Sequence, residues 1–195
     1  MGLARLIVRQ LARPSRLTGR LMNLANASVN EQAVELLELS SEHRVLEVGF
    51  GGGVALTKLA GRVAFVAGID PSEPVVRAAC RRFHDEIATG RVQIREAVVD
   101  AIPFEGASFD RALSVNTIYF WSDPDTGLRE VLRLLKPGGR LVLATEARRV
   151  PRRITKHGFT LYTEEEQIGL LQRAGFSNVR IERRGPLVFV LGTKV

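Results

Sequence analysis

"VLEVGFGGGVAL", residues 45–56, places four glycines within five positions, directly after a run of branched aliphatic residues. The aliphatic run predicts a buried strand, and the residues after the glycines predict a helix over 53–60. Glycines at such a junction leave the main chain bare, so a ligand can approach it closely. The N–H groups at the start of the helix can then donate hydrogen bonds to that ligand. This stretch therefore predicts a ligand-binding loop at the end of a first strand.

The rest of the chain alternates between short apolar segments and helical ones, which predicts an α/β fold with a mostly parallel sheet and helices on both faces. Strands are expected over 44–48, 63–69, 91–96, 109–115, 140–145, 178–184 and 187–193. The first helix is expected to begin at a capping box over 28–31 and to end near Leu39. Further helices are expected over 53–60, 73–88, 124–135 and 163–174. Because only "RGP" joins the last two strands, the last strand must run antiparallel to its neighbour.

Length and composition fit one cytoplasmic domain. A chain of 195 residues with 45% hydrophobic residues can bury a single core. Its one cysteine, Cys80, excludes an internal disulfide framework and a cysteine-rich zinc site. No apolar stretch approaches the roughly 18 residues that span a bilayer, and Arg5 and Arg9 interrupt the only segment that could resemble a signal peptide.

The net charge of +7 is concentrated in two segments. Residues 1–30 hold five arginines and no acid, and residues 148–156 hold five further cations and no acid. The remaining body of the chain is therefore net negative. Leu3, Leu6, Ile7 and Leu11 have helical spacing between the first arginines, which predicts a short basic amphipathic helix. We expect residues 1–30 to form an extension or lid over a domain that covers residues 31–195.

The glycine loop does not fit a dinucleotide. The dinucleotide fingerprint would use Gly49 and Gly51 and would then require a small residue where Val54 stands. The motif present is E-x-G-x-G-x-G, which begins at Glu47 and ends at Gly53. An acid beside the loop disfavours a phosphate and favours an ammonium group.

Four motifs in order resemble those of the class I S-adenosylmethionine-dependent methyltransferases, in the small-molecule branch around the ubiquinone and menaquinone biosynthesis type. They are the glycine motif, Asp70 at the end of the second strand, "IPFEGASFD" before the fourth strand, and "LRLLKPGGRLVL" before and into the fifth. The resemblance runs from about residue 44 to 146 and implies a Rossmann-like, seven-stranded fold. It also implies S-adenosylmethionine as the cofactor and S-adenosylhomocysteine as the product.

The resemblance assigns cofactor contacts to this chain residue by residue. Glu47 and the glycines would hold the methionine part, Asp70 would bind both ribose hydroxyls, and Ala97 and Val98 would meet the adenine ring. At the position of Val98 the family usually has a polar side chain against the adenine amine; here that role falls to Asp100 if the loop curls, or to no side chain. The predicted cofactor-binding set is Glu47, Gly49, Phe50, Gly51, Gly53, Asp70, Pro71, Ser72, Ala97, Val98 and Asn116.

Methyl transfer from a sulfonium has an excellent leaving group, so the protein can work mainly by positioning and desolvation. If the acceptor is a phenol or an amine, a proton must still leave, and the candidates for a base are Tyr119, His157 and Tyr162. Tyr119 lies in "SVNTIYFW", the segment after the fourth strand, whose aromatic residues either line a substrate site or fill the core. No metal site is expected.

A small organic acceptor is the leading substrate class. The ten clustered cations favour an acceptor that is anionic or presented at an acidic membrane surface, with residues 1–20 in peripheral contact with the membrane. The same arginines could simply be solvated, or they could bind RNA, which keeps an RNA-modifying enzyme as the alternative. A cofactor-binding protein without catalysis also remains open, because a fold does not determine a function.

Overall fold

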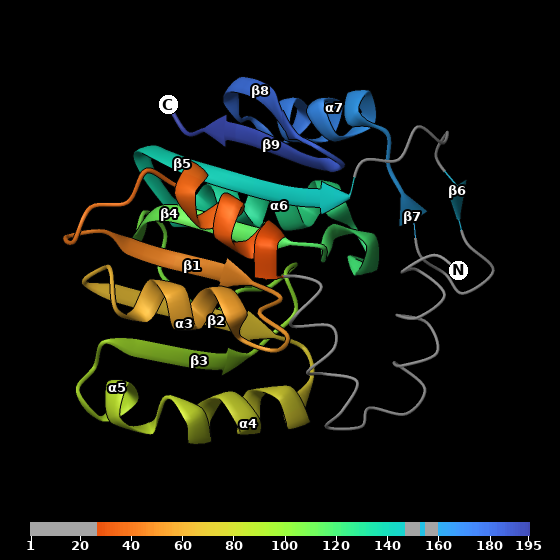
Figure 1. Cartoon of the computed structure of the whole chain (residues 1–195). Helices are drawn as coiled ribbons and strands as arrows, with labels where there is room; N and C mark the ends of the chain where they lie inside the picture. Colours follow the sequence, from red (N-terminus) through yellow and green to blue (C-terminus); the bar gives the residue numbers. More distant parts are fainter. Residues whose placement is uncertain (1–26, 147–152, 155–159) are drawn as a thin grey trace.

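The structure, a computed structural model, describes residues 27–146, 153–154 and 160–195. Seven strands form one sheet in the order β3-β2-β1-β4-β5-β9-β8 (Figure 1). Neighbours from β3 to β5 are parallel, and β9 runs antiparallel to both β5 and β8. The predicted fold class and the antiparallel last strand are confirmed. The strands are β1 (Arg44–Val48), β2 (Phe65–Asp70), β3 (Val92–Glu96), β4 (Phe109–Val115), β5 (Leu135–Glu146), β8 (Ser177–Arg184) and β9 (Leu187–Thr193).

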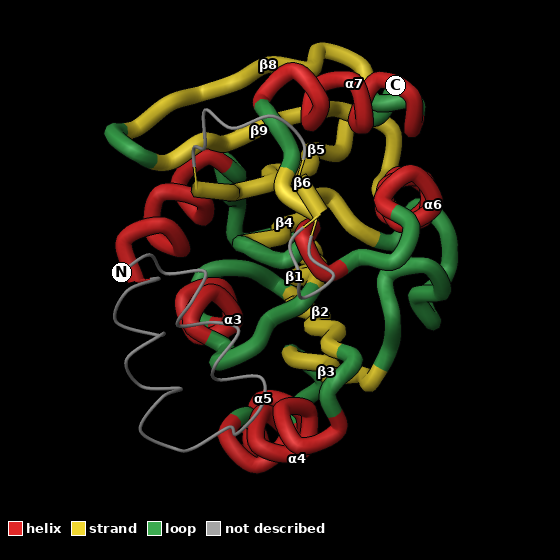
Figure 2. Tube along the Cα trace, turned by 90° about the vertical axis from the view of Figure 1, so that its right-hand side faces the viewer, coloured by secondary structure: helices red, strands yellow, loops and turns green. Residues whose placement is uncertain are grey.

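Helices cover both faces of the sheet. Figure 2 looks onto the edge where the parallel strands end and shows α6 and α3 on opposite sides of the strands. The alternation of buried residues produces this arrangement: Leu46 belongs to the core beneath α6 and α7, and Val45 belongs to the core beneath α3. The described helices are 27–36, α3 (Val54–Ala60), α4 (Glu73–Arg82), α5 (His84–Ala88), η1 (Ile118–Phe120), α6 (Pro124–Leu134) and α7 (Glu164–Ala174).

The first described helix starts earlier than the sequence predicts. Residue 27 is already helical, so the predicted capping box that starts at Ser28 is wrong. Ser28 lies inside the helix, where its Oγ accepts a hydrogen bond from Gln32 one turn later. Val29 and Asn30 are buried, so these residues belong to the folded domain. The predicted amphipathic segment over 3–13 lies outside the described residues.

Two arginines that face each other in the register of β4 and β5 hold the carboxyl end of this helix. Arg111 Nε donates to the carbonyl of Leu37 at 2.6 Å, and Arg140 Nη1 donates to the carbonyl of Leu36 at 3.1 Å. A helix leaves its last carbonyls without partners inside the helix, and cationic donors satisfy them. These bonds fix the carboxyl end of the helix against the sheet at the level of Val45, near the start of β1 and at the edge opposite the glycine loop.

Two further predictions need correction. The helix predicted over 73–88 is divided at Phe83, which is buried and has φ −102° and ψ 25°. The fifth strand begins at Leu135 and includes the Pro-Gly-Gly segment, because its pairing with β4 shifts register between Phe109 and Arg111. A second sheet, β6 (Arg153–Ile154) with β7 (Thr160–Leu161), was not predicted. None of the described helices is long and apolar enough to cross a membrane.

Candidate functional site

The glycine loop follows β1 at the edge where the parallel strands end, which is where α/β sheets bind ligands. Gly49 has φ +72°, and a Cβ there would lie 2.6 Å from Cγ2 of Thr117, the residue before η1. Gly51 has φ +49°, and no described atom lies within 4 Å of the position that its Cβ would take. Gly49 therefore allows the main chain to pack against Thr117, and Gly51 leaves open space beside the loop.

Asp70 links the end of β2 to this loop. Its Oδ2 accepts from the Gly51 N–H at 2.9 Å, and its Oδ1 accepts from the Ser72 N–H at 3.0 Å. The side chain is 8% exposed. Burial raises the pKa of Asp70, and the two backbone hydrogen bonds oppose that rise. Pro71 lies exposed beside it. Asp70 thus holds the loop and keeps a carboxylate at the predicted ribose position.

Glu47 is a buried carboxyl directly before the glycines. It is 2% exposed, and among the residues that the structure describes no donor reaches its Oε2 atom. Burial raises the pKa of Glu47 to about 8, the backbone N–H of Leu56 lowers it, and the negative charge of Asp70 raises it further. Leu56 lies in the first turn of α3, so Glu47 also acts as a cap for that helix. This raised pKa favours the protonated carboxyl in the cofactor-free protein at neutral pH, and a nearby cation would favour the ionised form.

The residues predicted to meet adenine lie next to Asp70. The N–H of Ala97 donates to the Asp70 carbonyl at 3.2 Å, which places the segment after β3 beside the segment after β2. Val98 is 54% exposed and offers an apolar side chain there. Phe50 differs from its neighbours in the loop because its ring is buried against Gly68, so its side chain lies in the core.

The segment after β4 completes this edge of the sheet. Asn116 has φ +56°, and its N–H donates to the carbonyl of Ala144 on β5 at 2.9 Å. The rings of Tyr119 and Tyr162 are partly buried against the same core cluster, and β7, directly before Tyr162, lies beside η1. The structure thus brings two of the three predicted base candidates to one region. His157 lies outside the described residues.

Two contacts at the site were not predicted. Arg82, the last residue of α4, donates from Nη1 to the carbonyl of Gly52 at 3.2 Å. Ser122 Oγ donates to Asp100 Oδ2 at 2.7 Å and joins the segments after β3 and β4. An arginine at a helix end looks like an ordinary partner of the helix dipole in the sequence, and a Ser–Asp pair 22 residues apart carries no motif.

A family model described as a methyltransferase domain matches residues 46–143, just over half of the chain. The chain belongs to the methyltransferase domain family. The match covers the glycine loop, Asp70 and the Pro-Gly-Gly segment, which are the motifs that suggested the resemblance. This family membership makes the protein an S-adenosylmethionine-dependent methyltransferase, with S-adenosylmethionine as its cofactor.

Named relatives agree with this identification. The methyltransferase is 26% identical over 171 residues to the uncharacterized methyltransferase YdaC of Bacillus subtilis, a match that covers 85% of this chain and 89% of the relative. It is 32% identical over 166 residues to the chloroplastic 2-methyl-6-phytyl-1,4-hydroquinone methyltransferase 1 of Oryza sativa, covering 81% of this chain. The match covers 48% of the rice relative, so the chain spans about half the length of that protein.

A solved structure shares the fold of this methyltransferase. Phosphoethanolamine N-methyltransferase 2 of Haemonchus contortus, in complex with S-adenosyl-L-methionine, superposes with a TM-score of 0.74 at 18% identity. The superposition covers 85% of this chain and 52% of that one.

The described residues of the methyltransferase fit the cofactor. The open space at Gly51 leaves the main chain accessible, and the buried Glu47 carboxyl suits a cationic group. The cofactor supplies the activated methyl group, and the protein binds and orients it. Within residues 27–146, 153–154 and 160–195, no group of three or more His, Cys, Asp or Glu side chains is placed to hold a metal ion.

The raised pKa of Glu47 predicts how the stability of the cofactor-free methyltransferase depends on pH. Between 4.5 and about 8 the folded protein holds a proton that the unfolded chain has released. Raising the pH through this range therefore favours unfolding, by up to about 1.4 kcal/mol per pH unit. We expect Glu47→Gln to remove this slope and the exposed Glu73→Gln to keep it, with the free energy of unfolding measured by urea denaturation. Equal slopes in the wild type and Glu47→Gln would show that Glu47 is ionised in the folded protein.

Proposed function

We propose that this methyltransferase transfers a methyl group to a small, largely apolar organic acceptor by in-line displacement. The observation that carries the proposal is an apolar rim at the carboxyl edge of the sheet, formed by Phe120, which is 45% exposed. The segment of Phe120 is joined to the predicted adenine segment by the Ser122–Asp100 hydrogen bond. Large apolar side chains exposed beside a functional site indicate a ligand that buries them.

The acceptor class is supported by two further observations. The rice relative is named for a hydroquinone that carries a phytyl chain, an aromatic ring with a long hydrocarbon tail. The ten cations of residues 1–30 and 148–156 suit an anionic acceptor or one held at an anionic membrane surface. A lipophilic phenol satisfies both observations, because its ionised form is an anion and its tail matches the apolar rim.

The proposal predicts which acceptors react. We expect methyl transfer from labelled S-adenosylmethionine to phenols and hydroquinones that carry a hydrocarbon tail, and weaker transfer to the same rings without the tail. Phe120→Ser should raise the KM for the tailed acceptor about ten-fold, because burying a phenylalanine side chain contributes about 1.5–3 kcal/mol. Val195→Ser, an exposed apolar residue at the far end of the chain, is the control and should leave KM unchanged. Transfer to RNA with no transfer to phenols would replace this acceptor class by the nucleic acid alternative.

The proton of a phenol must be accepted by a neighbouring group, and we assign this step to Tyr119 or Tyr162. We expect one of the two variants, Tyr119→Phe or Tyr162→Phe, to lower kcat by about 100-fold, the usual size of general base catalysis. The other should be nearly neutral, and S-adenosylmethionine affinity should be unchanged in both, since neither residue is predicted to contact the cofactor. Full turnover in both variants would remove these tyrosines as bases and leave His157 of the predicted three.

A further inference from the structure

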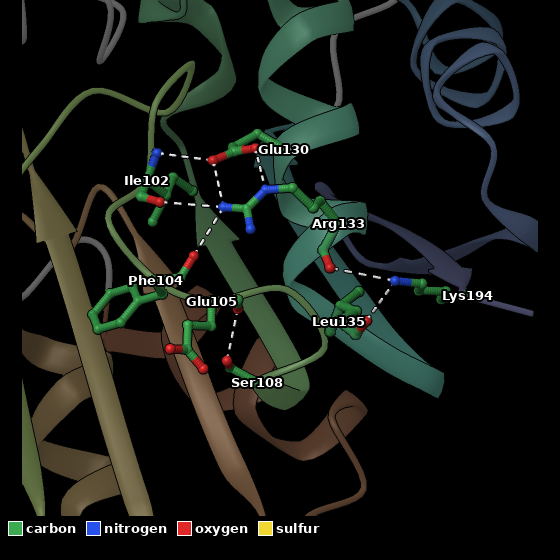
Figure 3. A network of polar contacts seen from close by, with 8 residues as sticks. All are labelled: Ile102, Phe104, Glu105, Ser108, Glu130, Arg133, Leu135 and Lys194. Atoms are coloured by element: carbon green, nitrogen blue, oxygen red, sulfur yellow. Dashed lines mark hydrogen bonds and ion pairs between the residues drawn. The ribbon is translucent and has the colours of Figure 1, made fainter.

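The segment between β3 and β4 is fastened to α6 by a pair of charged side chains that the sequence analysis did not identify. Figure 3 shows Glu130 and Arg133 of α6 facing the main chain of Ile102 and Phe104. Glu130 Oε1 accepts from the Ile102 N–H at 3.0 Å. Arg133 Nη2 donates to the carbonyls of Ile102 at 3.3 Å and Phe104 at 3.0 Å.

The two side chains also hold each other. Arg133 Nε donates to Glu130 Oε2 at 2.7 Å, and Arg133 Nη2 donates to Glu130 Oε1 at 2.8 Å. The guanidinium lowers the pKa of Glu130, and the carboxylate raises that of Arg133. A planar guanidinium that pairs with a carboxylate in two places has little freedom left, so its remaining contacts are well defined. The Glu130–Arg133 pair is therefore a preformed clamp for the main chain of the segment.

The clamp lies a few residues from the predicted adenine contacts. Ala97 is hydrogen bonded to the end of β2 at Asp70, and Val99 packs against Gly127 of α6 so closely that a Cβ at Gly127 would be 2.8 Å from Val99 Cγ1. The clamp then fixes Ile102. The main chain of Ala97 and Val98 is thus held on both sides, by Asp70 before it and by the Val99 packing, the Asp100–Ser122 hydrogen bond and the clamp after it.

This fixation matters because of Val98. A polar side chain at that position could find the adenine ring by adjusting its own rotamer, and valine cannot form such a hydrogen bond. Recognition then depends on main-chain groups or on Asp100 further along the segment, and the positions of both are set by whatever holds the segment. Small displacements of positioned groups are costly to binding, since hydrogen bonds weaken steeply with geometry.

We propose that Glu130 and Arg133 are positioning residues for the cofactor. They do not contact the cofactor themselves, and they act on it through the main chain of Ala97 and Val98. The proposal rests on the predicted contact of that segment with adenine and is independent of the acceptor class. It makes α6 part of the cofactor site, and it gives the helix before the Pro-Gly-Gly segment a role in affinity.

The test compares two ion pairs that involve α6, one within the helix and one between α6 and α7. Arg133→Met removes the clamp, and Arg173→Met removes the exposed pair of Arg173 with Asp125 at 3.0 Å, which ties α7 to α6. We expect Arg133→Met to weaken S-adenosylhomocysteine and adenosine binding in calorimetry by about ten-fold, the equivalent of one lost hydrogen bond. Arg173→Met should change either affinity by less than two-fold. Hydrogen exchange of the amides of residues 97–102 should become faster in Arg133→Met and should stay at the wild-type rate in Arg173→Met.

Glu130→Gln provides a second variant that keeps an acceptor for the Ile102 N–H and loses the charge. It should fall between the wild type and Arg133→Met in affinity, and the double variant should be no weaker than Arg133→Met, because the two residues act as one unit. Faster exchange with unchanged affinity would overturn the proposal, since the segment would then be held by the clamp without serving the cofactor. Unchanged exchange and affinity would overturn it as well. A wild-type protein that binds neither ligand would refute the cofactor assignment itself, whereas a failed acceptor screen with normal binding would leave the clamp supported.

Discussion

Asp70→Ala is expected to weaken the binding of S-adenosylmethionine and S-adenosylhomocysteine by at least about 100-fold, because it removes two hydrogen bonds to a charged acceptor at about 1.5–3 kcal/mol each. The loss has a second component in this structure. Asp70 also accepts from the N–H groups of Gly51 and Ser72, so alanine releases the loop that the cofactor needs in place. Titration calorimetry on the purified variant measures the combined effect.

Asp70→Asn separates these two components. Asparagine keeps one acceptor for the backbone N–H groups and loses the negative charge, so the loop should stay closer to its native position. We expect affinity between that of the wild type and that of Asp70→Ala. Asp85→Ala, an exposed acid after the end of α4, is the matched control and should bind normally. Tight binding by a folded Asp70→Ala protein would show that the cofactor is held elsewhere.

The second large effect comes from comparing alanine at two glycines of one loop. Gly49→Ala should destabilise the protein by about 2–5 kcal/mol, because it adds overpacking of about 1–3 kcal/mol to the cost of a left-handed residue, about 1–2 kcal/mol. The clash is with Thr117 Cγ2, 2.6 Å from the new Cβ. Gly51→Ala has a positive φ and no described neighbour within 4 Å, so it should cost only the conformational part, about 1–2 kcal/mol. Its methyl group would instead occupy ligand space.

The two variants should therefore lose different properties: Gly49→Ala should mainly lose stability, and Gly51→Ala should mainly lose cofactor affinity. We expect Gly49→Ala to show the larger loss in urea denaturation, and Gly51→Ala to show the larger loss of cofactor affinity relative to its stability. The double variant Gly49→Ala with Thr117→Ser removes the clashing methyl group and should recover part of the stability. If Gly51→Ala binds the cofactor as the wild type does, the open side of the loop does not face the ligand.

The hydrophobic pattern was sufficient to place most of the fold. β1, β4 and β9 begin and end at the predicted residues, because each is a short apolar run bounded by turns or polar residues. The predicted helix over 73–88 failed at Phe83 for a reason that lies outside its own segment. The Phe83 ring is buried near Gly53, and this tertiary packing takes precedence over continuation of the helix.

Some residues of the candidate site could likewise be identified from the sequence, and others could not. The positions of Glu47, Asp70 and the glycines followed from motifs, because each lies directly at the end of a strand and strand ends meet at one edge of the sheet. Glu130 and Arg133 could not be recognised, since a glutamate and an arginine three positions apart look like any surface pair of a helix. Their partners are main-chain atoms some 30 residues away, and main-chain atoms leave no signature in a sequence.

The position of β9 has a consequence for how the sheet is completed. β9 follows β8 in the chain but lies between it and β5, and it pairs with β5 at seven positions, from Arg140 with Thr193 to Glu146 with Leu187. β8 therefore joins the sheet only through β9, either after β9 has paired with β5 or together with it as a hairpin. Until then β5 is an open edge with the apolar run Leu141–Leu143, of the kind that pairs with other chains. During synthesis, aggregation should be most probable in the interval between the appearance of β5 and that of Thr193.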